Sequence, residues 1–180
     1  MTTVTSDLLD RYQNYRVRRW LIQEQRLSGL LPGWRTRRRR RALAVTVVLA
    51  IAVMLLAGLL CALDLRMAAL AILPATLIFI PAWGMLRVVS QVQDSAPAVT
   101  LDELEIAQRN SARSAGLTVT QILTLLPVFY LIFVSVLAPE ISAFQSAYAG
   151  GVMVLATLLA GGCTPGLILA WNRPDPEPES

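Results

Sequence analysis

The 180-residue chain contains no histidine and no lysine, so all sixteen of its basic residues are arginine. Histidine is the commonest general base and the commonest metal ligand, and a Ser–His or Cys–His nucleophile pair cannot form without it. Neither a GxSxG motif nor a phosphate-binding loop occurs in the sequence. We therefore predict a protein that is not an enzyme and that binds no metal and no cofactor.

Charge is also scarce, because Asp, Glu and Arg make up 16% of the chain, against about 25% in a typical soluble domain. Four long apolar stretches contain no charged residue at all. Each would be about 30 Å long or more as a helix, which is enough to cross a bilayer. Coupled transporters usually carry an ionisable group at depth, so its absence argues against that class, including four-helix drug exporters with an embedded acid. The four stretches are residues 42–63, 67–86, 117–137 and 147–171.

The two cysteines, Cys61 and Cys163, lie near opposite ends of the first and fourth of these stretches. Helical rise places them on the order of 20 Å apart in depth. A disulfide between them is excluded at that separation.

These features predict an all-α fold, namely an integral membrane four-helix bundle of two antiparallel transmembrane hairpins. Polar segments flank and interrupt the four spans. Residues 1–41 are Arg-rich and carry an amphipathic helix, and the tail 172–180 is predicted to be disordered. The loop 87–116 is predicted to hold a separate helix, 101–115, with Thr100 and Glu103 as a capping box and Gly116 as a joint to the third span.

Arginine is distributed unevenly, since eleven of the sixteen lie within residues 1–41, against three acids there. Only Arg66 lies in the two short loops that follow the first and third spans. The positive-inside rule then predicts that both termini and the loop 87–116 are cytoplasmic, an N-in/C-in topology. Trp34, Trp83 and Trp171 would lie at the same interface, as aromatic belts do.

The arginine run just ahead of the first span has two interpretations. It is an orientation signal, or it also contacts anionic phospholipid headgroups, for which clusters of four to eight basic residues are typical. Nucleic acid is not an expected partner, because the run directly abuts the membrane and has one aromatic neighbour, Trp34. The candidate headgroup contacts are Arg35, Arg37, Arg38, Arg39, Arg40 and Arg41.

A polar flank within the third span consists of Thr120, Gln121 and Thr124. These residues either line a path for a solute or lipid beside Pro127, or they form hydrogen bonds with neighbouring helices. In the fourth span, Gly151, Gly162 and Gly166 predict close helix packing, within the bundle or between protomers.

The acids Asp102, Glu103 and Glu105 either form a solvated, well-capped surface or dock a cytoplasmic partner. The sequence Leu-Asp-Glu-Leu-Glu at 101–105 ahead of the third span, with the Arg-rich start and the two hairpins, resembles small four-span integral membrane proteins of actinobacteria. That group has no established activity, so the resemblance implies a class of protein, in the bacterial plasma membrane, and no mechanism.

The interpretation that follows is a non-catalytic accessory or scaffold subunit of a membrane complex. Its expected partners are the bilayer, with anionic phospholipid, and either another membrane protein or further copies of the chain. The alternative is a small transporter or channel-like protein for a solute or lipid that uses the polar flank.

Overall fold

The computed structural model describes Tyr15, Arg18 and Ile22 and residues 36–90, 102–138 and 140–172. Within these residues the chain is helical and contains no strand, so the predicted all-α class is confirmed. Four helical segments are each long and apolar enough to cross a membrane. The N-terminal helix 7–27 lies mostly outside the described residues, as do Arg35, Thr100 and the tail after Asn172.

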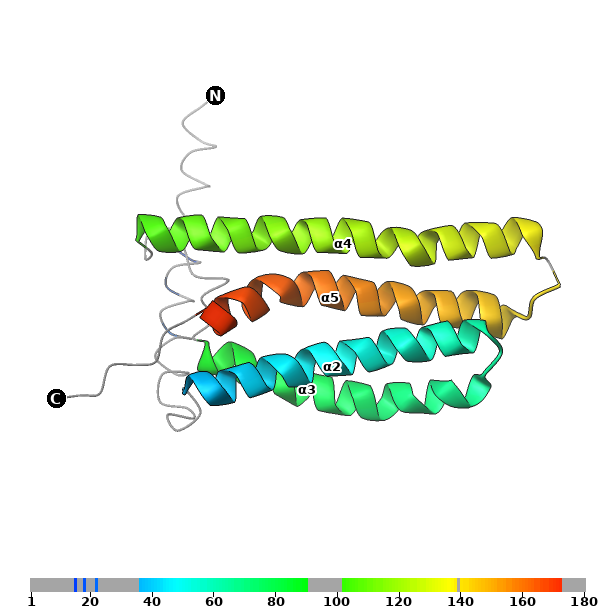
Figure 1. Ribbon diagram of the computed structural model, residues 1–180, viewed down its shortest axis with the longest axis horizontal. Coiled ribbons are helices and arrows are strands. Elements are labelled where there is room, and N and C mark those ends of the chain that lie inside the picture. The colour runs from blue at the N-terminus through cyan, green and yellow to red at the C-terminus, as the bar shows by residue number, and fades with distance from the viewer. Residues whose placement is uncertain are drawn as a thin grey trace, which may run out of the picture.

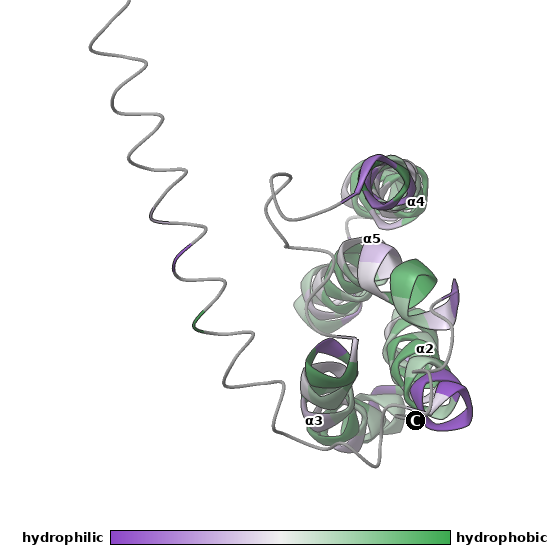
Figure 2. Ribbon diagram, turned by 90° about the vertical axis from the view of Figure 1, so that its left-hand side faces the viewer, coloured by the Kyte–Doolittle hydropathy of each residue, from purple (hydrophilic) through white to green (hydrophobic). Residues whose placement is uncertain are grey.

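The helices form two antiparallel hairpins that lie side by side (Figure 1). Helix α2 (Arg37–Ala62) is followed by the 3-10 helix η2 (Arg66–Ala71) and by α3 (Ile72–Val89). Helix α4 (Glu103–Leu137) is followed by the π-helical turn η5 (Phe144–Tyr148) and by α5 (Ala149–Asn172). The hairpins meet through α2 and α5, whereas α4 packs against α5 at the edge (Figure 2).

The turn after α2 is built on Asp64, which has a φ of 66°. Aspartate is one of the few residues with a side chain that tolerates this left-handed conformation. Its carboxylate accepts a hydrogen bond from Nε of Arg66 at 3.2 Å. The Arg66 guanidinium also lies 5.5 Å from the ring centroid of Phe144, which connects the two hairpins at this end of the bundle.

The second predicted span consists of η2 and α3 rather than one α-helix. Pro74 therefore lies in the first turn of α3, where a backbone N–H has no intrahelical acceptor, so the proline removes no helical hydrogen bond. Pro81 alone remains inside α3.

The predicted joint at Gly116 is wrong, because α4 continues through it as one helix of 35 residues. The predicted capping box is also displaced. Asp102, not Thr100, is the N-cap, and Glu105, not Glu103, returns a hydrogen bond to it. The sequence Thr-Leu-Asp-Glu-Leu-Glu contains both matches, and aspartate is as good an N-cap as threonine.

The third and fourth predicted spans leave a loop at residues 138–146 between them. The loop is shorter than that, since the fourth helical segment already begins at Phe144 with η5. The hydroxyl of Tyr130 on α4 donates a hydrogen bond to the backbone carbonyl of Gln145 at 2.6 Å. This bond satisfies a backbone acceptor within the π-helical turn and fixes the end of α4 to the start of the last helix.

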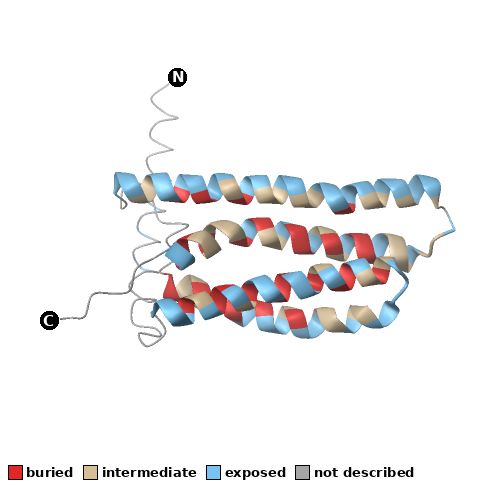
Figure 3. Cartoon of the chain, viewed as in Figure 1, coloured by how far each residue is buried: buried red, intermediate tan, exposed pale blue. Residues whose placement is uncertain are grey.

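The hydrophobic core lies between α2, α3 and α5, and buried residues concentrate there (Figure 3). Val47 and Met54 of α2 are 0% and 2% exposed and contribute to this core with Leu86 of α3 and Ala156 of α5. Both cysteines are buried, Cys61 in α2 and Cys163 in α5.

Helix α4 packs on α5 through residues that have little or no side chain. Gly116 lies against Pro165, where an added Cβ would be 2.8 Å from Cδ. Gly161 lies directly against Thr120, and Gly150 against Leu131. The glycines allow the two backbones to approach closely, which is how helices associate where lipid removes the hydrophobic driving force.

The close approach predicts different effects for two neighbouring glycines. Gly161→Ala places a methyl group against Thr120, so we expect the unfolding free energy to fall by about 1–3 kcal/mol, as for other overpacked sites. Thermal unfolding of the full chain in mild detergent measures this loss. Gly162→Ala is the control, because an added Cβ there meets nothing within 4 Å. Equal destabilisation by the two variants would contradict the α4–α5 packing described here.

Candidate functional site: the basic end and the outward face of α4

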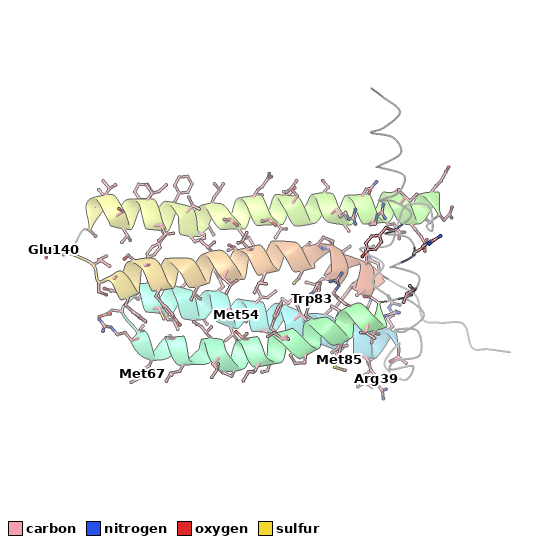
Figure 4. All side chains as sticks on the ribbon, turned by 180° about the vertical axis from the view of Figure 1, so that it is seen from behind. Arg39, Met54, Met67, Trp83, Met85 and Glu140 are labelled. Carbon is pink, nitrogen blue, oxygen red and sulfur yellow. The ribbon has the colours of Figure 1, made fainter. Side chains whose placement is uncertain are left out.

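Arginine residues collect at one end of the bundle. The run at the start of α2 shares this end with Arg87 at the close of α3 and with Arg109 and Arg113 in the early turns of α4. Figure 4 shows Arg39, Trp83 and Met85 toward this end, whereas Met67 and Glu140 lie at the other. Among the described residues, Arg66 is the only arginine at the far end. The fold therefore separates a basic end from a nearly neutral one.

The five arginines of α2 that the structure describes differ in exposure. Arg37, Arg38 and Arg39 are exposed, Arg41 is half-buried, and Arg40 is buried at 2% exposure. All five stand in the first turns of the helix, and the first turn of α2 contains no acidic residue. The positive end of the helix dipole adds to their charge instead of offsetting it. This concentration of positive charge favours anions at the basic end.

Tryptophan accompanies arginine at this end. The guanidinium of Arg41 stacks over the ring of Trp171 at 4.6 Å, and that of Arg87 lies 5.9 Å from the ring centroid of Trp83. Trp83 also covers Gly166, where an added Cβ would be 2.8 Å from the indole ring. Of the three glycines predicted to pack helices, Gly166 alone faces a close neighbour; Gly151 and Gly162 have none within 4 Å.

The α4–α5 contact uses three other glycines, which the sequence does not predict as packing residues. Gly116 is predicted only as a joint, and Gly150 and Gly161 each stand next to one of the predicted packing residues. In a Gly-Gly pair either residue satisfies a small-residue pattern, so spacing within one helix does not determine which one faces a neighbour. Thr120 and Thr124, which lie on the face of α4 that packs on α5, were the sequence feature that could have identified this contact.

The polar flank of the third span is divided between two faces. Thr120 faces Gly161, and its hydroxyl donates to the carbonyl of Gly116 at 2.8 Å. The hydroxyl of Thr124 donates to that of buried Thr157 on α5 at 3.3 Å. Gln121 is exposed on a different side of the helix. The two threonines thus have the geometry of interhelical packing, and Gln121 stands apart from them.

Gln121 lies halfway along the bundle. Its neighbour Thr120 faces Gly161, which is close to the middle of α5 (Ala149–Asn172). Ser114, Thr118 and Gln121 are all exposed and follow helical spacing on the side of α4 that turns away from α5. We name these three residues the outward polar row. Gln121 is the last member of this row along α4 and lies within the charge-free stretch 117–137.

The surface around the outward polar row is apolar and uncovered. Only 6% of the most apolar 18-residue stretch of α4 is buried, against 44% for α2 and 39% for the η5–α5 segment. Ile122, Leu126 and Phe133 are more than half exposed. This side of α4 is therefore available to lipid or to another helix.

The acidic residues at the start of α4 serve the helix itself. The Asp102 carboxylate accepts from the backbone N–H of Glu103 at 2.7 Å, and the Glu105 carboxylate accepts from the N–H of Asp102 at 3.3 Å. Glu103 is exposed. Two of the three acids considered for partner docking thus cap the helix, and their charges suit its positive end.

Within residues 36–90, 102–138 and 140–172, no group of three His, Cys, Asp or Glu side chains is arranged to hold a metal ion. No known protein family, curated protein or solved structure matches this chain. The fold and composition alone define its class, an all-α protein with four helices able to cross a membrane.

Proposed function

We propose that the protein is a non-catalytic accessory or scaffold subunit of a membrane complex in the bacterial plasma membrane. In this function the four helices span the bilayer and α4 binds another membrane protein laterally. The observation that carries the proposal is the outward polar row, because a glutamine at the depth of the hydrocarbon core is stabilised by a hydrogen-bonding partner on a neighbouring helix.

The partner that fits is a transmembrane helix with an amide or hydroxyl side chain at the level of Gln121. A primary amide both donates and accepts hydrogen bonds, so it pairs with either kind of group. The apolar residues beside Gln121, such as Ile122 and Leu125, supply the packing surface. Thr120 and Thr124 are already occupied by α5 and do not share a face with Gln121, which favours docking over a conduit lined by all three.

We further propose an N-in/C-in orientation with the basic end in the cytoplasm. The end that holds Arg37–Arg41 also holds Arg87, Arg109 and Arg113, and cytoplasmic segments of membrane proteins carry an excess of arginine. Trp83 and Trp171 lie toward the same end, at the level expected of an aromatic belt. The opposite end, with Asp64 and Glu140, would face outward.

Gln121→Leu tests the docking function. We expect the full-length tagged chain, extracted from native membranes in mild detergent, to retain a stoichiometric membrane-protein partner. The Leu variant loses one interhelical hydrogen bond, worth about 1 kcal/mol, so partner recovery falls roughly fivefold. Quantitative mass spectrometry of the co-purified proteins measures this change.

Gln108→Leu is the matched control, since it makes the same substitution on an exposed part of α4 before the apolar stretch. It should leave partner recovery unchanged. If the tagged chain co-purifies only with further copies of itself, and these copies cross-link through residue 121, α4 serves self-association and the accessory function is wrong. A chain that binds nothing through α4 yet transports a solute would overturn the proposal in favour of a conduit.

Cysteine labelling tests the orientation. In a background with Cys61 and Cys163 replaced by alanine, we expect Glu140→Cys to react with a membrane-impermeant maleimide in intact cells. Glu103→Cys should react only after permeabilisation, because it lies on exposed surface at the basic end. The reverse labelling pattern would show that the basic end faces outward.

A further inference from the structure

A groove of about 360 Å³ runs between α2 and α5 next to the basic end. Its walls are almost entirely apolar, with Val45, Val48 and Leu49 from α2 and Leu167, Ile168 and Trp171 from α5. The groove opens to the surroundings, since Val48 and Leu49 are 50% and 59% exposed. It therefore has the lining and the access that a hydrocarbon chain requires.

Arg41 stands at the mouth of this groove. Residues 41, 45 and 48 follow the spacing of one helical face, so the arginine lies directly above Val45 and Val48. Arg37 belongs to the same face, one turn closer to the start of α2. A cationic group therefore lies beyond the apolar groove, on the side toward the basic end of the bundle.

Arg41 has a half-buried side chain, and its guanidinium contacts Trp171. The guanidinium carbon lies 4.6 Å from the indole centroid, so the two groups form a cation–π contact. The Nε–H is buried and has no hydrogen-bond partner among the described residues, so the two terminal amino groups are the donors that could meet a phosphate. Arginine binds phosphate through the N–H groups at its edge, often through two at once, and stacking on an aromatic ring does not block that edge.

We propose that this groove is a binding site for one anionic phospholipid, with the phosphate on Arg41 and an acyl chain along Val45, Val48 and Leu49. The site rests on the proposed placement of the basic end at a headgroup layer. From Arg41 to Leu49 the helix rises about 12 Å, most of the ~15 Å of hydrocarbon in one leaflet. The arginine would meet the charged headgroup of the phospholipid, and the apolar groove that follows it would meet the acyl chain.

A phospholipid fits this site better than a water-soluble phosphate does. The apolar walls below Arg41 offer a soluble anion no hydrogen bond, whereas they exclude water around an acyl chain. The positive end of α2 and the neighbouring arginines add long-range attraction for an anionic lipid over a zwitterionic one.

Native mass spectrometry of the full-length chain in mild detergent tests the site, with equal amounts of phosphatidylglycerol and phosphatidylcholine added. We expect one retained phosphatidylglycerol and weaker retention of phosphatidylcholine. Arg41→Gln should weaken phosphatidylglycerol binding about tenfold, the loss expected for a hydrogen bond to a charged group. Val48→Trp, which fills the groove at an exposed position, should abolish retention of this lipid.

Two matched variants serve as controls. Arg39→Gln removes the same charge from the opposite side of α2, and Leu56→Trp introduces the same side chain at an exposed α2 position outside the groove. Equal losses for Arg41→Gln and Arg39→Gln would reduce the effect to general charge and overturn the site, as would unchanged binding in Val48→Trp. Competition by glycerol phosphate at the same concentration would show a soluble-phosphate site instead.

These variants also separate the lipid site from the proposed docking function. All of them lie on α2, whereas the docking variant lies on the outward face of α4. If the wild-type chain retains its protein partner but no phosphatidylglycerol, the lipid site fails and the docking function stands. If it retains phosphatidylglycerol but no protein partner, the docking function fails and the lipid site stands.

Discussion

The close approach of α5 to α4 is the constraint on which the second hairpin and the position of α4 in the bundle depend. Gly116, Gly150 and Gly161 bring the two backbones together, and Thr120 and Thr124 fill the space between them. The opposite side of α5 packs against α2 and so joins the core. Because α5 is used on both sides, α4 is left at the edge with most of its surface uncovered. The exposed outward polar row is a direct result of this order of packing.

The same geometry separates two surfaces of different character. On α4, an amide at mid-length lies among exposed apolar side chains, which suits a helix partner. Between α2 and α5, an apolar groove ends at an arginine stacked on tryptophan, which suits a lipid. The two surfaces lie on different helices, so a lipid and a protein partner would not compete for the same residues.

The sequence predicts the number, type and approximate limits of the four long helices. Long runs of uncharged apolar residues are compatible with few structures other than helices that cross a membrane. It does not predict the continuity of α4 through Gly116 or the shift of its cap to Asp102. Glycine costs only about 1 kcal/mol inside a helix, and packing against Pro165 outweighs that cost. The candidate residues were harder to place. Thr120, Gln121 and Thr124 are close in sequence, but a helix turns about 100° per residue, so only helix pairing decides which of them faces a neighbour.

The uninterrupted length of α4 has a mechanical consequence. At 35 residues the helix is about 52 Å long, and its tightest contacts with α5 lie near its middle, around Thr120. The middle and the far half of the helix are both held, because Gly116, Thr120 and Leu131 pack on α5 and Tyr130 bonds to Gln145. A sideways force on the capped end at Asp102 would therefore meet a continuous helix that is fixed at several points. A flexible joint at Gly116 would uncouple that end from the bundle, whereas the packing of the glycine against Pro165 couples the two.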